Sequence, residues 1–203
     1  RHQSYIDHPL PDLLAQRISQ IASGYADGND ANSLRHDPMC KLGVERRPLD
    51  PEQTLAGAPT FSRLAHQVDR KALYRLTTAL VQPFIASSHE PPAAIVLDLD
   101  HTDDPTYGQQ ECTFYHHHYQ NPCYLPLFIF EGTSHALVTA YLRPGPRPTG
   151  AANAMSLVRL LSYLRHHWPR THILVRGDSH VATPEIIAVI ASYRWTDVVL
   201  GLA

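Results

Sequence analysis

The sequence predicts an α/β fold, a mixed β-sheet with flanking helices, preceded by an α-helical N-terminal region. Apolar residues over 1–90 recur at the three-to-four-residue spacing of amphipathic helices, whereas short apolar runs typical of strands begin at Ala93. The segments after residue 91 follow the order β-β-β-α-β-α-β, in which an antiparallel meander precedes α/β alternation. Ser87–Pro92 has the composition of a linker, so we expect domains at 1–90 and 91–203.

The helical region contains two apolar stripes with a polar stretch between them. The first stripe follows Pro9 and runs from Leu10 to Tyr25, and a turn-rich segment follows it. Thr60 is a candidate N-cap for a further helix, and the second stripe runs from Leu73 to Phe84. We therefore expect at least two helices in this part of the chain.

The second half is expected to supply the sheet and two covering helices. Apolar runs bounded by turn residues predict strands at 93–100, 124–130, 136–142, 172–176 and 197–202. Helical spacing predicts a helix at 153–168, and Pro184, favoured at a first helical position, starts another. The sheet is therefore expected to be mixed.

Composition excludes several classes of protein. The chain has 203 residues, 43% hydrophobic and 18% charged, which is typical of a folded globular protein rather than a disordered chain or a coiled coil. Its longest apolar run is far too short to span a membrane. The net charge of −2 argues against a strongly basic nucleic-acid binder. Three cysteines without a pairing pattern suggest free thiols in a reducing, cytoplasmic setting.

Two acidic residues on the first predicted strand are the strongest chemical signal. Asp98 and Asp100 alternate with Leu97 and Leu99, so the two carboxylates share one face of the strand. Carboxylates on an apolar strand need a cationic partner, and a divalent metal ion with oxygen ligands is a natural one. The alternative is an edge strand whose acids are solvated.

A second acidic position follows a later strand. Arg176-Gly-Asp178-Ser179 comes directly after an apolar run, and sites in α/β sheets collect at the carboxyl ends of strands. An aspartate there is also a common turn residue or helix cap. Together with Asp98 and Asp100, however, Asp178 becomes a candidate metal ligand.

The order of several motifs closely resembles the DDE-type transposases of bacterial insertion sequences. Within them, the chain is similar to the group that carries a DxDxTDDPxxGxQ block. The resemblance covers nearly the whole chain, in the correct order, over the segments 16–25, 29–32, 34–38, 59–64, 97–110, 124–132, 142–145 and 175–179.

The resemblance implies a ribonuclease-H-like catalytic core and two-metal chemistry on DNA phosphodiesters with Mg²⁺ or Mn²⁺. It implies that the first acid lies on the first strand and the second after the fourth. A Thr two residues after the first acid fits Asp100 better than Asp98, and Asp178 fits the second position. Partners would be the inverted-repeat ends of a mobile element in the bacterial cytoplasm, and a second copy of the chain. Residues 1–90 would contribute DNA or assembly contacts, with Arg46, Arg47 and Arg63 as candidates for phosphate binding.

The third acid implied by the family, a Glu on a later helix, has no counterpart in this sequence. Glu185 is a poor substitute because it lies in the first turn of a predicted helix, where an acid complements the helix dipole. We therefore expect a partial copy that is inactive alone, and whether it is an enzyme stays open. A non-catalytic DNA-binding or regulatory fragment is one alternative.

Two further alternatives rest on local patterns. Asp98-Leu-Asp100-His-Thr resembles the first motif of haloacid-dehalogenase-type phosphatases, but the lysine expected between their motifs is absent after Lys71. His116-His117-His118, between two cysteines, suggests zinc. Consecutive histidines on a strand point to alternate faces, so a polar loop near DNA is the simpler interpretation.

Overall fold

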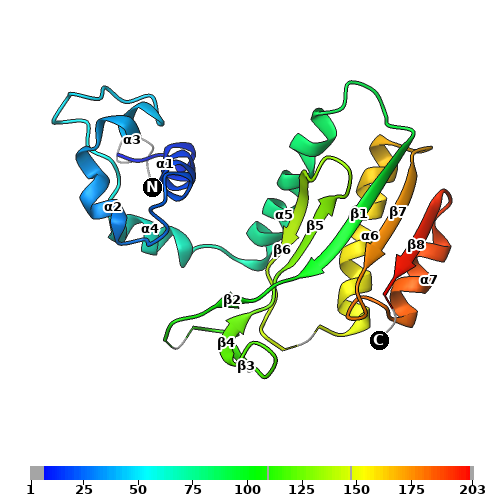
Figure 1. The fold of residues 1–203 in the computed structure, drawn as a ribbon. Helices are drawn as coiled ribbons and strands as arrows, with labels where there is room; N and C mark the ends of the chain where they lie inside the picture. Colours follow the sequence, from blue (N-terminus) through cyan, green and yellow to red (C-terminus); the bar gives the residue numbers. More distant parts are fainter. Residues whose placement is uncertain (1–6, 109, 147, 202–203) are drawn as a thin grey trace. The chain divides into compact units, whose positions relative to one another are not determined.

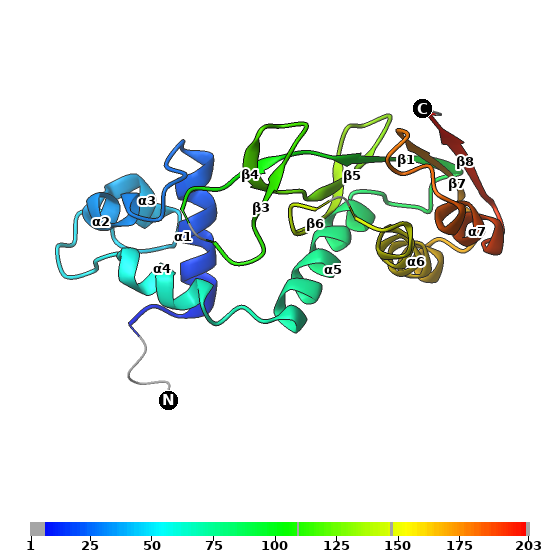
Figure 2. The ribbon, with the colours of Figure 1, turned by 90° about the horizontal axis from the view of Figure 1, so that it is seen from below.

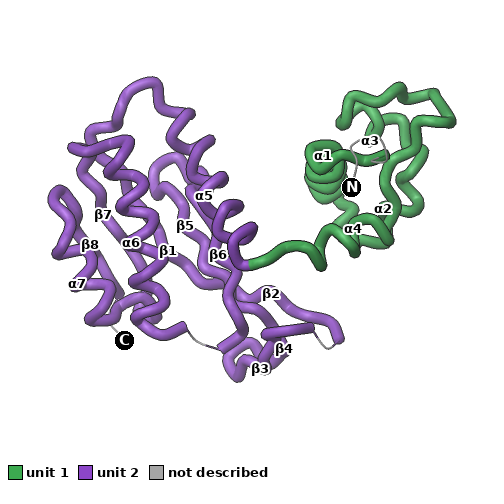
Figure 3. The backbone as a smooth tube through the Cα atoms, turned by 180° about the vertical axis from the view of Figure 1, so that it is seen from behind, with its two compact units in different colours: residues 1–69 green, residues 70–203 purple. Residues whose placement is uncertain are grey.

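The computed structural model describes residues 7–108, 110–146 and 148–201, in a chain that forms two compact units, residues 1–69 and 70–203 (Figures 1 and 3). This division differs from the one expected after residue 90. The helix α5 (Arg70–Ala86) belongs to the second unit because Val81 and Phe84 are buried in its core. The Thr139 hydroxyl also donates to the Thr77 carbonyl at 2.9 Å.

The first unit is helical, as expected. Its helices are α1 (Leu10–Ala22), α2 (Asp30–Ser33), a 3₁₀ turn (Leu34–His36), α3 (Pro38–Leu42) and α4 (Ala58–Ala65). Gln16 of α1 is buried and exchanges two hydrogen bonds with the backbone of Ala56, at 2.8 and 3.0 Å. Thr60 is not the cap that the sequence suggested, because α4 starts two residues earlier, with Gly57 as its N-cap and Pro59 in its first turn.

The second unit contains a five-stranded mixed sheet in the order β6-β5-β1-β7-β8. Its strands are β1 (Ala94–His101), β5 (Leu127–Glu131), β6 (Leu137–Tyr141), β7 (His172–Gly177) and β8 (Thr196–Leu200). The pairs β1–β5 and β5–β6 are antiparallel, and β1–β7 and β7–β8 are parallel. For the strands of this sheet and the helices between them, the expected β-β-β-α-β-α-β order and the mixed sheet are therefore confirmed.

Helices cover one face of this sheet. Figure 2 shows α5, α6 (Gly150–His167) and α7 (Pro184–Ser192) on the same side of the strands. Alternate residues of β1, including Leu97 and Leu99, are buried on this side with Leu161 of α6. The side chains of Asp98 and Asp100 lie on the opposite face, where the described part of the chain places no helix.

Side-chain caps fix where the two later helices begin. The Thr149 hydroxyl accepts a hydrogen bond from the Ala152 N–H, so α6 starts a few residues before the sequence suggested. The Thr183 hydroxyl accepts from the Ile186 N–H, and Pro184 takes the first helical position as expected. Leu202, in the last expected strand, lies outside the described residues.

A small second sheet, which the sequence analysis did not foresee, lies between β1 and β5 in the chain. It contains β2 (Asp104–Pro105), β3 (Phe114–His116) and β4 (Asn121–Tyr124), in the order β2-β4-β3. The single strand expected at 124–130 is therefore two, because β4 ends at Tyr124 and β5 starts at Leu127. Pro126 between them has no N–H for a ladder, and its carbonyl accepts from Thr102 N–H instead.

Among the described residues, no helix is long and apolar enough to cross a bilayer.

Candidate active site

Two parallel neighbours, β1 and β7, end side by side and bring two of the expected acids to the same sheet edge. Their register pairs residues 78 positions apart, from Ala94 with His172 to Leu99 with Gly177. Asp100 and Asp178 are the residues that directly follow this last pair. Neighbouring strands lie about 4.8 Å apart, so the two aspartates follow adjacent backbone positions of the sheet.

Both carboxylates are open to solvent. The Asp178 carboxylate accepts a hydrogen bond from the His180 N–H at 2.9 Å and lies 3.6 Å from Nδ1 of the same residue. No ion pair to Asp100 is present among the described side chains. The two groups are thus accessible oxygen donors at the carboxyl ends of adjacent strands, where a ligand can reach them.

Asp98, the other acid of β1, is already neutralised. Its two carboxylate oxygens each accept a hydrogen bond at 2.6 Å from the Arg176 guanidinium, one from Nε and one from Nη2. Asp98 and Arg176 are paired directly across β1 and β7, so the strand register holds the bidentate contact in place. The hydrogen bonds that Arg176 donates to Asp98, together with the charge of that carboxylate, raise the pKa of Arg176.

The turn between β5 and β6 lies against this ion pair. A Cβ atom added to Gly132 would lie 2.6 Å from Nη2 of Arg176 and 2.7 Å from Oδ2 of Asp98. A glycine therefore allows the close approach of the turn to the pair. Glu131 shapes the same turn by accepting hydrogen bonds from Val96, Thr133 and Ser134.

Two side chains near the accessible acids have shifted pKa values. Burial and the nearby Arg143 lower the pKa of His101, although Asn153 and Asp178 act in the opposite direction. Burial raises the pKa of Tyr119, and the charges of Asp103, Asp100 and Asp178 raise it further. Asp100 and Asp178 therefore lie close enough to Tyr119 for both to affect its phenol.

The carboxylates of Asp100 and Asp178 fit a divalent ion that keeps several water ligands better than an ion whose ligands all come from the protein. Among the described residues, no group of three or more His, Cys, Asp or Glu is placed to hold a metal ion. Asp100 and Asp178 supply two carboxylates, and Mg²⁺ commonly binds one or two carboxylates while keeping several waters. The oxygen donors are of the type that Mg²⁺ and Mn²⁺ prefer.

The local contacts of Glu185 do not favour it as a third metal ligand. It occupies the first turn of α7, and its carboxylate is so close to Gly150 that a Cβ atom there would clash with it. The carboxylate thus lies beside the first residue of α6 as well as in the first turn of its own helix. Both positions favour a negative charge for a structural reason.

The histidine run belongs to an aromatic cluster on the small sheet. The ring of His116 lies 6.5 Å from that of His118 and 4.9 Å from that of Tyr119. Of the two flanking cysteines, Cys112 is exposed and Cys123 is buried. No zinc-like group of ligands forms there among the described residues.

The arginines of the first unit differ in how free their guanidinium groups are to bind a phosphate. Arg46 donates to the carbonyls of Asp7 and Thr54 and pairs with Asp12 at 3.2 Å, so its guanidinium supports the unit. The Arg46 guanidinium is therefore less available for a phosphate than the expectation assumed. Arg47 and Arg63 are more exposed.

Sequence reasoning missed three participants at this site. Arg176 was noted only as part of a motif, although an arginine on a strand next to acidic residues is a signal for an ion pair. His101 was likewise noted only as part of the motif in which it directly follows Asp100. Tyr119 carries no local pattern that would single it out, and its proximity to the acids depends on the small second sheet.

Comparison with known proteins identifies the family to which the sequence is similar. The family model described as transposase DDE domain, group 1, matches residues 1–203. No curated protein matches the chain. The family match supports the transposase interpretation over the phosphatase alternative.

Several solved structures show a weak likeness. The Mos1 transposase paired-end complex with left transposon end is 9% identical with a TM-score of 0.37, covering 85% of this chain and 57% of that one. The piggyBac transposase synaptic complex with hairpin DNA is 12% identical with a TM-score of 0.43, covering 73% and 34%. The Drosophila P element transposase strand transfer complex is 10% identical with a TM-score of 0.31, covering 87% and 39%. The chain thus spans little more than half of the first of these chains and less of the others, and no part of the site is inferred from them.

Proposed function

This chain belongs to the family of transposases with a DDE domain of group 1, and on that premise we propose that it acts on DNA phosphodiesters through a divalent metal ion bound by Asp100 and Asp178. The observation that supports the proposal is the parallel register of β1 and β7, whose last pair, Leu99 with Gly177, directly precedes these two accessible acids. Mg²⁺ or Mn²⁺ is the expected ion, and the inverted-repeat ends of a mobile element are the expected DNA.

The acidic residues of the site have two different roles in this proposal, metal ligand and positioning residue. Asp100 and Asp178 offer their carboxylate oxygens as ligands, since neither is held by an arginine. A divalent ion bound there would activate an attacking oxygen and neutralise charge on the phosphate. Asp98 is a positioning residue in this proposal, because its bidentate contact leaves the Arg176 guanidinium fixed across the two strands.

We further propose that residues 1–203 alone do not join DNA strands. Two-metal chemistry holds two cations about 4 Å apart, which requires several carboxylates to offset their repulsion. Asp100 and Asp178 provide two, and Asp98 is occupied by Arg176. Strand joining in Mg²⁺ or Mn²⁺ that is lost in Asp178→Ala would contradict this part of the proposal.

We propose that the first unit contributes DNA or assembly contacts, because it has exposed arginines such as Arg47 and Arg63. Binding of the full chain to an inverted-repeat duplex should weaken as salt rises, because phosphate contacts release counterions. A double Arg47→Gln/Arg63→Gln variant with unchanged affinity and salt dependence would assign this unit to assembly instead.

Metal binding tests the site directly. We expect Asp100→Asn and Asp178→Asn each to weaken Mn²⁺ binding by at least about tenfold, measured from the electron paramagnetic resonance signal of free Mn²⁺. Asp197→Asn, which removes an exposed acid of β8, is the matched control. Asp98→Asn should bind Mn²⁺ like the control.

The outcome separates the ligands from the positioning residue. If Asp98→Asn weakens Mn²⁺ binding as strongly as Asp100→Asn, the assignment of Asp98 is wrong. If Asp100→Asn and Asp178→Asn both behave like Asp197→Asn, the metal site itself is wrong. A chain that binds DNA without this metal site would then be a regulatory DNA-binding protein.

A further inference from the structure

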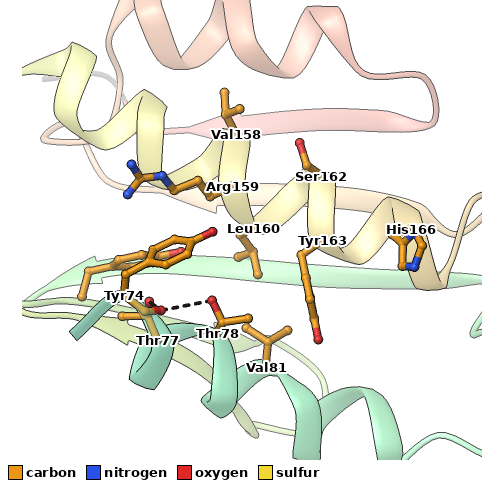
Figure 4. A pocket seen from close by; sticks show the side chains of 11 residues that line it. Tyr74, Thr77, Thr78, Val81, Val158, Arg159, Leu160, Ser162, Tyr163 and His166 are labelled. Atoms are coloured by element: carbon orange, nitrogen blue, oxygen red, sulfur yellow. Dashed lines mark hydrogen bonds between the residues drawn. The ribbon is translucent and has the colours of Figure 1, made fainter. Parts of the chain in front are cut away.

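A groove lies between α5 and α6 (Figure 4), and Tyr141 of β6 also lines it; its walls combine aromatic and polar side chains with the apolar Val81, Val158 and Leu160. Its volume is about 370 Å³, which is in the range of small-ligand sites. Tyr74, Thr77 and Thr78 of α5 form one wall, and Arg159 and Tyr163 of α6 lie across from them. The groove is on the helix-covered side of the sheet, so it is separate from the face that carries Asp100.

The groove has only positive charge in its walls. Neither α5 nor α6 contains an Asp or Glu. Arg159 is exposed, and no acidic partner pairs with it among the described residues. Arg70 and Lys71 lie one turn before Tyr74 on the same side of α5, which extends the positive charge along the groove.

Arg159 is held in a geometry that leaves its donors free. Its guanidinium carbon lies 5.0 Å from the centre of the Tyr74 ring, within the range of a cation–π contact. No hydrogen bond or ion pair of its guanidinium is present among the described residues, so its N–H groups can bind an anion in bidentate fashion. The Thr77 and Thr78 hydroxyls both donate to the Tyr74 carbonyl, at 2.7 and 3.1 Å, which fixes this turn of the helix.

The walls suit a phosphate backbone better than a peptide. An exposed arginine next to an exposed aromatic ring, here Arg159 next to Tyr74, is a combination with which proteins hold single nucleic-acid strands. An acidic amphipathic peptide would need a row of apolar contacts in the groove. Of the apolar residues that line it, Val81 and Leu160 are almost fully buried and only Val158 is exposed, and the exposed leucines of α5, namely Leu73, Leu76 and Leu80, do not line it.

We propose that the α5–α6 groove is a second DNA-contact surface, in which Arg159 binds a backbone phosphate and Tyr74 supports it. The proposal rests on the proposed function, because it takes DNA as the partner. It adds a contact on the side of the sheet opposite the acids, where DNA could be held without touching Asp100 or Asp178.

The test measures binding of a fluorescent DNA duplex to the full chain by anisotropy at several salt concentrations, with EDTA present. We expect Arg159→Gln to weaken binding about 3- to 10-fold and to reduce the salt slope by roughly one unit, as the loss of one phosphate contact predicts. Arg194→Gln, which removes an exposed arginine from the loop between α7 and β8, should bind like the wild type. Arg159→Lys should restore the salt slope.

Each result decides between the partners. If Arg159→Gln and Arg194→Gln have the same affinity and salt slope, the groove is not a DNA contact, although DNA binding by the chain stands. If Arg159→Gln leaves DNA binding unchanged but weakens binding of a labelled glutamate-rich peptide, the groove is a protein site and the proposal is overturned. If the wild type binds no DNA, the proposed function fails first. Because EDTA removes divalent ions, none of these results depends on the metal site.

Discussion

Replacing Glu131 by glutamine should destabilise the second unit measurably. Glu131 is 7% exposed and ends β5 at the turn that lies against the Asp98–Arg176 pair. Its Oε2 atom accepts from the N–H groups of Thr133 and Ser134 at 3.1 and 2.6 Å and from the Ser134 hydroxyl at 2.7 Å. Its Oε1 atom accepts from the Val96 N–H at 3.3 Å.

The expected loss follows from this arrangement. A glutamine has one acceptor oxygen, so either the three donors at Oε2 or the Val96 N–H must face an amide NH₂ group. Hydrogen bonds to charged groups each contribute about 1.5–3 kcal/mol, and a buried donor left unpaired costs about 1–3 kcal/mol. We therefore expect Glu131→Gln to lower the free energy of unfolding by about 1–3 kcal/mol, or Tm by roughly 4 °C for each kcal/mol.

The effect should also depend on pH in a defined direction. Burial raises the pKa of Glu131, but the hydrogen bonds from Ser134, Val96 and Thr133 outweigh burial and lower it below the ordinary 4.5. A carboxyl with a lowered folded-state pKa stabilises the protein above its unfolded value and loses that contribution as pH falls through the folded value. The difference between wild type and Glu131→Gln should therefore be full at pH 7 and shrink below about pH 4.5.

Urea unfolding followed by circular dichroism at pH 7 and at several acidic pH values measures this difference. Glu90→Gln, an exposed glutamate ahead of β1, is the control and should change the free energy of unfolding by less than about 0.5 kcal/mol. The reasoning is refuted if Glu131→Gln is as stable as Glu90→Gln at pH 7. A difference that stays constant on acidification would refute the role assigned to the charge.

Three other predictions follow from burial and backbone packing. Leu161→Ala, at a fully buried position of α6, should lower the free energy of unfolding by about 2–5 kcal/mol, whereas Leu142→Ala, at an exposed position, should change it little in the same urea titration. Gly145→Ala should disrupt the small sheet, because the new Cβ would overlap the Cys123 carbonyl, and faster proteolysis within residues 102–126 would show it. Burial raises the pKa of Tyr141 to about 12, so its stabilising effect is complete below pH 10 and lost as pH rises toward 12. In an ultraviolet titration of the tyrosines, Tyr141→Phe should lose the absorbance step near pH 12. Loss of a step near pH 10 instead would contradict this prediction.

Much of the second unit could be predicted from local sequence. Alternation in β1 placed Asp98 and Asp100 on one face, and the order of the strands and helices was correct. The strand expected at 124–130 was wrong because periodicity alone does not show that Pro126 interrupts a ladder. The small sheet was missed since its strands are two to four residues long, too short for a reliable pattern.

The candidate site was predictable in its residues but not in its pairing. Side-chain alternation gave two equivalent candidates on β1, between which the family resemblance favoured Asp100. The register of β1 with β7 adds that Arg176 lies opposite Asp98, and that Asp100 and Asp178 directly follow the pair of Leu99 and Gly177. The α5–α6 groove also required the fold, because Tyr74 and Arg159 are 85 positions apart in the chain.

The sequence by itself determined the α/β class, the family and the identities of the acidic residues, because these depend on local periodicity and on motifs within short segments. The tertiary structure decided that α5 belongs with the sheet, that Asp98 is neutralised, and which side chains surround the accessible acids. These features depend on contacts between residues far apart in the chain. Such contacts are set by strand register and by the packing of helices on one face of the sheet, which no local pattern encodes.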